Sequence, residues 1–157
     1  PTDPVAVLTS VAGGLVKAGV LVVRLKRQKN SVDKLIELRL NTKFEKTNDI
    51  DPSAQKLADE INGIPSIKVD GFGNREFDVI SQDFIGQTFG GVNYSIKPKS
   101  FLSKSRRAQI RATLDAANVT GRTALFNFEG GLTPSQEVID FISRNAERRD
   151  ASFIIRN

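Results

Sequence analysis

Three ionisable residues in the middle of the sequence have the types and spacing that phosphodiester hydrolysis requires. Asp78 lies in the apolar stretch Glu76–Ile80, where a charged carboxylate is costly unless a cation pairs with it. Lys97 ends a second stretch of strand character, and Glu60 falls late in an expected helix. If the two stretches are neighbouring strands, Asp78 and Lys97 converge, and Ser95 shares the face of Lys97.

Such a group of residues would perform metal-assisted hydrolysis. Asp78 and Glu60 would hold a hard divalent cation through oxygen ligands, with Mg²⁺ expected and Mn²⁺ or Zn²⁺ as alternatives. Lys97 would orient or deprotonate the attacking water, while the metal stabilises the charge that develops on phosphorus. A structural ion pair between Asp78 and Lys97 at a strand edge would explain the same residues without catalysis.

A run of basic residues follows this group and is the candidate nucleic-acid-binding surface. It comprises Lys99, Lys104, Arg106, Arg107 and Arg111. Lys104, Arg107 and Arg111 fall on one face of a helix expected over residues 103–117. A basic stripe beside a metal site suits the phosphate backbone of a nucleic acid. A solvated helix face would have the same pattern.

Composition narrows the chemistry further. The chain has 157 residues, enough for one domain with a sizeable core, and contains neither cysteine nor histidine. Thiolate zinc sites, cysteine nucleophiles, Ser-His-Asp triads and histidine-based nuclease chemistry are therefore excluded. Acidic residues gather in residues 51–94, while the flanking segments 1–50 and 95–157 are basic, and the net charge is +5. Carboxylates flanked by cations suit a metal-dependent enzyme that acts on phosphodiesters.

The expected elements follow the order α-β-β-β-α-β-α-β. The dipeptide Asp51-Pro52 predicts the start of a helix that stops at Gly63. The later elements are the strands Ile64–Val69, Glu76–Ile80 and Val92–Lys97, a helix over 103–117, the strand Thr123–Phe128, a helix over 133–146 and the strand Ala151–Ile155. Gly86, Gly90 and Gly91 indicate a flexible connection before the third strand.

The N-terminal segment has a different character. Residues Val5–Val23 are mostly apolar with one charge, Lys17, and a basic flank follows them. The length is borderline for a membrane span. The segment predicts either a helix packed on the domain or a membrane-active helix. No charged region precedes it, so it is not a signal peptide, and the chain has the character of an excised fragment.

The acidic residues, the lysine and the order of the expected elements resemble those of a known protein family. The helical acid, the strand Asp and the strand-end Lys are similar to the PD-(D/E)xK restriction-endonuclease-like fold, a mixed α/β sheet flanked by helices. More narrowly, residues 76–80, 94–101, 106–109, 121–123 and 126–130 resemble the C-terminal toxin domains of contact-dependent growth inhibition (CdiA-type) proteins. The resemblance extends from about Glu60 to the C-terminus.

The resemblance implies roles for individual residues. Asp78 matches the metal-binding Asp, Lys97 the catalytic Lys and Glu60 the helical acid. The family pattern places Glu, Asp or Gln two residues before the Lys, where this sequence has Ser95, a poorer ligand. The residues that would compensate or face the site are Asp83, Gln87, Arg106 and Gln109.

The resemblance also implies a function. The chain would be a bacterial toxin whose domain 51–157 is a metal-dependent nuclease, with tRNA as the favoured substrate and DNA as the close variant. Residues 1–50 would be a helical entry segment that engages an inner-membrane receptor, delivering the toxin into the cytoplasm of target bacteria. A cognate immunity protein is expected, acidic to match the basic surface. The alternatives are a non-catalytic nucleic-acid-binding module and a toxin that acts through its membrane-active segment.

Overall fold

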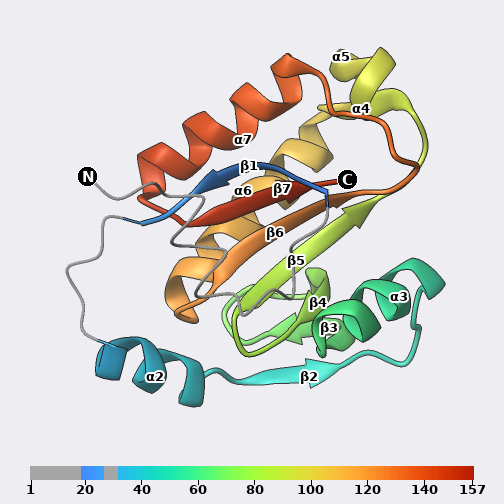
Figure 1. Cartoon of the computed structure of the whole chain (residues 1–157). Helices are drawn as coiled ribbons and strands as arrows, with labels where there is room; N and C mark the ends of the chain where they lie inside the picture. Colours follow the sequence, from blue (N-terminus) through green and yellow to red (C-terminus); the bar gives the residue numbers. More distant parts are fainter. Residues whose placement is uncertain (1–18, 27–31) are drawn as a thin grey trace.

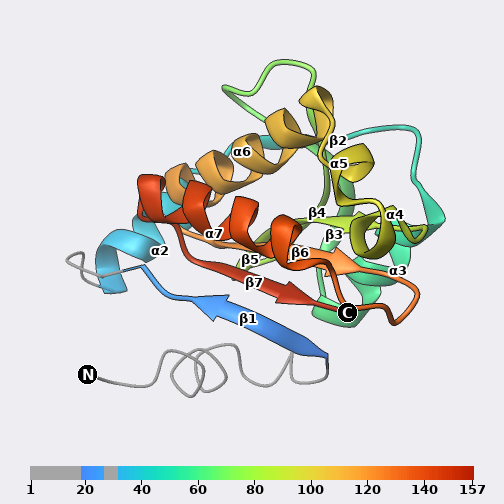
Figure 2. The same cartoon turned by 90° about the horizontal axis from the view of Figure 1, so that it is seen from above.

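The computed structural model describes residues 19–26 and 32–157, which form one seven-stranded sheet with helices on both faces (Figures 1 and 2). The strand order is β1-β7-β6-β5-β4-β3-β2. The strands are β1 (Val20–Arg24), β2 (Phe44–Lys46), β3 (Ile64–Val69), β4 (Glu76–Ile80), β5 (Phe84–Phe89), β6 (Thr123–Phe128) and β7 (Phe153–Arg156). The helices are α2 (Val32–Leu40), α3 (Pro52–Ile61), α4 (Asn93–Ile96), α5 (Pro98–Phe101), α6 (Lys104–Val119) and α7 (Gln136–Arg149).

The sheet has a parallel part and an antiparallel part. Strands β5, β6 and β7 run parallel, whereas β2, β3, β4 and β5 form an antiparallel meander and β1 pairs antiparallel with β7. In the parallel part Thr88 pairs in register with Asn127, and Asn127 with Arg156. Because paired residues project to the same side, these three polar residues form one row across the sheet.

Two hydrophobic layers hold the helices on the sheet. Helices α6 and α7 cover one face through the larger cluster, which includes Ile110, Leu114 and Ile142. Helix α3 covers the other face through Leu57, Ala58 and Ile61, which pack on Phe84 and Leu125. The row of polar residues therefore lies on the face that α3 covers.

Helix α3 begins and ends as its sequence predicts. The Asp51 side chain caps the helix by accepting a hydrogen bond of 3.0 Å from the Ser53 N–H, and Pro52 occupies the first turn. At the other end Asn62 adopts the left-handed conformation that closes a helix. The apolar positions of α3 lie on one stripe, and the polar positions along one side of that stripe can line a site.

Two expectations for residues 84–97 are wrong. The expected flexible connection contains β5, in which Gly86 is buried between neighbouring strands. The expected strand Val92–Lys97 contains the short helix α4, and Lys97 separates α4 from α5. The left-handed backbone of Gly91 turns the chain there, and the Tyr94 ring is buried in edge contact with Phe128, 4.9 Å between centroids.

The N-terminal region also differs from the expected pattern. Residues 20–24 form strand β1 rather than a helix, and the remainder of the apolar segment Val5–Val23 lies outside the described residues. Strands β1 and β2 pair with β7 and β3, so the described parts of residues 1–50 belong to the same sheet as residues 51–157. Among the described residues, no helix is both long and apolar enough to cross a membrane.

Substitution of Gly86 tests the close packing of β5 on β6. A Cβ at this position would lie 2.5 Å from the Leu125 carbonyl oxygen, so Gly86→Ala should lower the free energy of unfolding by about 2 kcal/mol. Chemical denaturation measures the change. Gly90→Ala is the control because the atom nearest to its added Cβ, a Glu129 carboxylate oxygen, lies at the ordinary contact distance of 3.7 Å. Equal stability of the two variants would contradict the packing argument.

Candidate functional site

The polar row forms a continuous hydrogen-bonded network at the carboxyl ends of the parallel strands. The Asn127 amide donates to the Thr88 hydroxyl oxygen at 2.9 Å, and Arg156 Nε donates to Asn127 Oδ1 at 2.6 Å. Asn127 and Arg156 are buried. Buried polar groups of this kind need partners, and each finds one on the adjacent strand.

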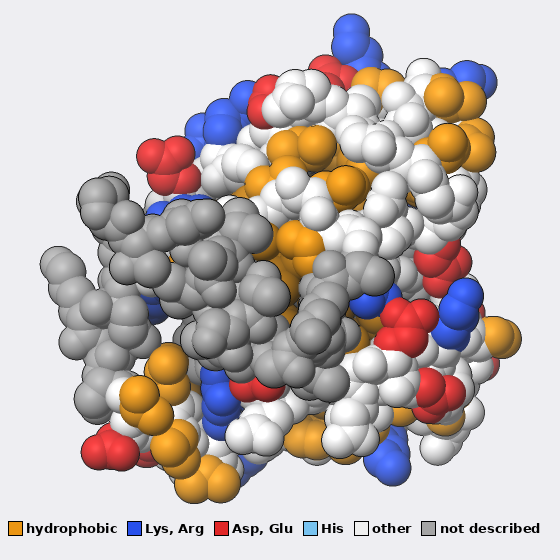
Figure 3. Space-filling view, in the orientation of Figure 1, with side chains coloured by type: hydrophobic (Ala, Val, Ile, Leu, Met, Phe, Trp, Pro, Cys, Tyr) orange, Lys and Arg blue, Asp and Glu red, His pale blue; other side chains and the backbone are white. Residues whose placement is uncertain are grey.

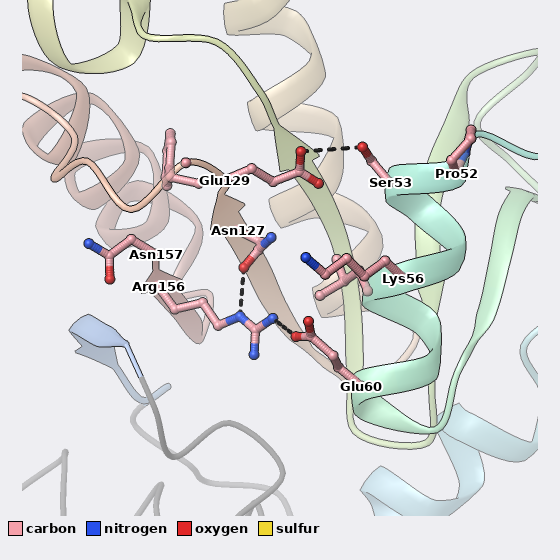
Figure 4. Close-up of a pocket in the computed structure, with 11 residues that line it drawn as sticks. Pro52, Ser53, Lys56, Glu60, Asn127, Glu129, Arg156 and Asn157 are labelled. Atoms are coloured by element: carbon pink, nitrogen blue, oxygen red, sulfur yellow. Dashed lines mark hydrogen bonds and ion pairs between the residues drawn. The ribbon is translucent and has the colours of Figure 1, made fainter.

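Helix α3 closes this row into a cleft of about 600 Å³ (Figure 4). Ser53, Lys56 and Glu60 face the row because their spacing places them on one side of the helix. Arg156 Nη2 forms an ion pair with the Glu60 carboxylate, which joins strand β7 to the helix. Lys56 extends from α3 toward the strands and has no hydrogen-bond or ion-pair partner among the described residues.

Two carboxylates meet at Thr88. The Thr88 hydroxyl donates to Glu129 Oε1 at 3.0 Å, and its backbone N–H donates to Asp78 Oδ2 at 2.8 Å. The other oxygen of Glu129 accepts a hydrogen bond of 3.2 Å from the Ser53 hydroxyl. Within the described part of the chain neither Asp78 nor Glu129 forms an ion pair.

The environment of Asp78 penalises its charge. Burial is the largest cause that raises the pKa of its carboxyl, to about 6, and the negative charges of Asp51 and Glu76 add to it. The hydrogen bond from Thr88 and the positive charge of Arg106 oppose this shift. A half-buried carboxylate held at this cost is typical of a functional site.

Arg106 is the cation whose charge reaches Asp78. Its guanidinium lies over the rings of Phe89 and Phe101, 4.7 Å from each centroid. Burial lowers the pKa of Arg106, and the charge of Asp78 opposes that shift. The aromatic contacts hold the side chain while leaving its N–H groups without a carboxylate partner among the described residues.

The structure gives Lys97 and Ser95 a different setting from the one expected. Lys97 is exposed between α4 and α5, beside Lys99 and Glu137, and Ser95 lies within α4. Lys97 is not among the charges that shift the pKa of Asp78. The expected convergence is wrong because β5, and not residues 92–97, is the strand that pairs with β4.

Glu60 is engaged elsewhere in the cleft. Its carboxylate pairs with Arg156, and the carboxylate that is joined to Asp78 through Thr88 is that of Glu129. Across residues 19–26 and 32–157, no group of three or more acidic side chains is arranged to hold a metal ion. Asp78 and Glu129 fit a divalent cation as a pair, since both offer carboxylate oxygens and neither forms an ion pair within the described residues.

Asp83 and Gln87, expected to compensate for Ser95, make contacts within the fold instead. Asp83 pairs with Arg39 at 3.1 Å, and the buried Gln87 amide donates to Thr113 of α6 at 3.3 Å. The backbone carbonyl of Gln109 accepts from Thr113 at 2.8 Å. Gln87 and Phe89 lie on β5, the strand that pairs with the strand of Asp78, and both are buried.

The predicted basic surface divides into two sets. Lys99, Lys104 and Arg107 are exposed. Arg111 instead stacks on Phe141, 5.3 Å from the ring centroid, and donates to Asn145 at 3.2 Å, so it holds α6 against α7. On the face viewed in Figure 3, acidic and basic side chains lie next to one another over α3.

Sequence reasoning missed most of the cleft. It gave no role to the cleft residues Lys56, Asn127, Glu129 and Arg156 or to the adjoining Thr88, although residues 126–130 are among those that carry the family resemblance. One signal was available: Glu129 directly follows an apolar strand and precedes Gly130-Gly131, a place where strand ends carry functional residues in α/β sheets. The row itself depends on the register of strands far apart in the sequence.

A mixed sheet with helices on both faces and a carboxylate pair at one edge is the arrangement of the restriction-endonuclease-like α/β fold. Residues 41–147 match the family described as restriction endonuclease fold toxin 3, and the chain belongs to that family. The expected fold class is therefore confirmed, and the chain is a toxin of the nuclease kind. No curated protein and no solved structure matches the chain.

Replacing Asp78 by Asn should stabilise the protein above pH 6. A folded-state pKa of about 6, raised from 3.8, means that stability falls as pH rises through this interval and Asp78 ionises. Asp78→Asn removes that cost. The free energy of unfolding of the variant should therefore exceed that of the wild type by up to about 3 kcal/mol at pH 7.5, and the difference should vanish below pH 4. Denaturation in EDTA at both pH values measures it. Asp59→Asn, on the exposed face of α3, should change little, and an equal gain there would contradict the assignment.

Removing the charge of Arg106 should raise the pKa of Asp78 above about 6. Arg106→Leu keeps an apolar contact with Phe89 and Phe101 but deletes the positive charge that lowers this pKa. Titration of the Asp78 carboxyl carbon by NMR measures the shift. Arg106→Lys retains the charge and should give a smaller change. An unchanged pKa in the leucine variant would show that the charge of Arg106 does not reach Asp78.

Proposed function

We propose that this toxin is a metal-dependent endonuclease that cleaves tRNA, with the carboxylates of Asp78 and Glu129 at its centre. The observation that carries the proposal is the joining of these two carboxylates through Thr88 with no ion-pair partner within the described residues. Restriction-endonuclease-like folds generally use divalent metals, and this pair offers the oxygen ligands that Mg²⁺ prefers.

A bound divalent cation would supply charge stabilisation on phosphorus and an activated water. Asp78 and Glu129 would hold it, with Thr88 fixing one oxygen of each carboxylate and Ser53 fixing the second oxygen of Glu129. Arg106 would bind a phosphate oxygen beside Asp78, because the aromatic contacts orient its guanidinium without consuming its hydrogen-bond donors. These roles replace those that the sequence predicted for Glu60 and Lys97.

The exposed cations of α5 and α6 support a nucleic-acid substrate. Lys99, Lys104 and Arg107 lie on or just before the helix that carries Arg106, so a strand leaving the site can follow them. The choice of tRNA rests on the resemblance to contact-dependent growth inhibition toxins. DNA cleavage is the competing outcome.

The biological setting is part of the same proposal. The chain would act in the cytoplasm of target bacteria after delivery from an inhibitor cell, and residues 1–50 would engage an inner-membrane receptor. A cognate immunity protein would bind the toxin, and its expected acidity follows from the net charge of +5 on the toxin. The residues that would contact the receptor lie partly outside the described ones.

Cleavage of total bacterial RNA and of plasmid DNA tests the activity directly. The purified chain should degrade tRNA with Mg²⁺, Mn²⁺ or Zn²⁺ and not in EDTA. Asp78→Asn and Glu129→Gln should each lower the rate by at least about a hundredfold, because each removes a charge that the metal requires. Asp59→Asn controls for loss of an exposed carboxylate.

Lys97→Ala separates the structural assignment from the sequence-based one. It should retain activity within a few-fold if Arg106 is the cation of the site. A loss as large as that of Asp78→Asn would restore Lys97 to the catalytic machinery. Metal-dependent plasmid cleavage in place of RNA cleavage would make the toxin a DNase. Salt-sensitive binding without cleavage under any metal would overturn the nuclease assignment in favour of a binding module.

A further inference from the structure

The cleft beneath α3 has two chemically different sides. Glu129, which is joined to Asp78 through Thr88, supplies acceptor oxygens on one side. Lys56 and Arg156 supply donor groups on the other side. The first side carries the proposed metal-dependent chemistry, and nothing in that chemistry uses Lys56 or Arg156.

Lys56 is available for a ligand. It lines the cleft, is exposed, and has no hydrogen-bond or ion-pair partner among the described residues, so its three N–H donors are free. The neighbouring helix residues Ser53 and Glu60 are engaged by Glu129 and Arg156. Figure 4 shows the Lys56 side chain directed across the cleft toward strand β6.

Arg156 is fixed in place before any ligand arrives. Its Nε donates to Asn127 and its Nη2 pairs with Glu60, while its Nη1 donates to no group in the described part of the chain. The residue is buried at 9% exposure, so its orientation is set by these partners. A fixed guanidinium contributes binding energy without paying the cost of ordering a free side chain.

We propose that the Lys56–Arg156 side of the cleft is a phosphate-binding subsite, which holds a backbone phosphate next to the one that is cleaved. The free donors of Lys56 and the Nη1 group of Arg156 favour an anion with several oxygens. Arg156 and Glu60 balance each other's charge, so Lys56 supplies the net positive charge of the subsite. The identity of the ligand as a nucleic-acid phosphate rests on the proposed nuclease function. The subsite would make the enzyme dependent on a phosphate flanking the cleavage point.

Anion binding without metal tests the subsite independently of catalysis. In EDTA, inorganic pyrophosphate is titrated into the full chain, and the Nε–Hε NMR signal of Arg156 reports binding. The signal should shift and saturate in the wild type. Lys56→Gln should weaken the apparent affinity about tenfold, because it deletes one charge-assisted contact, whereas Lys56→Arg should keep it.

Arg148→Gln is the matched control. Arg148 is an exposed cation without an ion-pair partner in the described residues, and it lies on α7, across the sheet from α3. Its removal lowers the net charge by the same amount as Lys56→Gln but should leave the affinity unchanged. An Arg156 signal that does not move, or equal weakening by Lys56→Gln and Arg148→Gln, would overturn the subsite.

Nucleic-acid binding gives the second readout. Under the same metal-free conditions, Lys56→Gln should reduce the salt dependence of tRNA affinity by about one released counterion relative to the wild type. If Lys56→Gln abolishes cleavage but binds pyrophosphate normally, Lys56 acts on the reacting phosphate and the subsite is wrong. Pyrophosphate binding with no cleavage of any nucleic acid would instead leave the subsite standing while the proposed function fails.

Discussion

The buried guanidinium of Arg156 is the interaction on which the arrangement of the cleft depends. A charge in that position is costly unless it is paired, and removal of either partner would leave a buried group uncompensated. Asn127 and Glu60 supply the pairing, one from the adjacent strand and one from α3. Helix α3 is therefore held over the sheet by the Glu60–Arg156 contact near its C-terminus and by apolar contacts along its length. The position of Lys56 and Ser53 above the strands follows from the same contact, because both lie on the helix face that Glu60 anchors.

A second constraint is the unfavourable placement of Asp78. Burial raises its pKa, nearby carboxylates raise it further, and the cation that opposes them is held on aromatic rings at a distance that forms no ion pair. A protein selected for stability alone would place Asn at this position, or pair the carboxylate directly. A positively charged ligand at the site would account for the cost of burying the Asp78 carboxylate. The same desolvation that penalises the free carboxylate strengthens its attraction to a cation.

Local signals predicted the elements well where the determinants lie close together in the chain. The cap at Asp51, the hairpin between β3 and β4, helix α6 after Ser103 and the strand before Gly130 all appear as expected. The prediction of a flexible connection at Gly86 was wrong. Glycine is required there because strand β6 approaches too closely for a side chain. The prediction of a strand around Tyr94 was also wrong. Tyr94 is buried between more exposed residues of a short helix, which gives the same alternating sequence pattern as a strand. Asp78 was identified because an acid between the apolar residues Phe77 and Val79 is visible locally. Its partners were not, because they depend on the pairing of strands up to 41 residues apart.

The cation near Asp78, Arg106, comes from a helix and not from the neighbouring strand β5. On β5, Gln87 and Phe89 face α6 and are committed to the core, which leaves that strand no position for a lysine beside Asp78. Positive charge comes from helices instead: Arg106 from α6 acts on Asp78, while Lys56 from α3 lines the cleft on the other face of the sheet. Cations on helices depend on helix packing for their placement, and both helices are packed through buried apolar stripes. Thr88 then connects the two faces, since its backbone N–H reaches Asp78 while its hydroxyl reaches Glu129 and the Asn127–Arg156 pair. A change that moved either helix would therefore alter the electrostatics of the carboxylate pair without touching it.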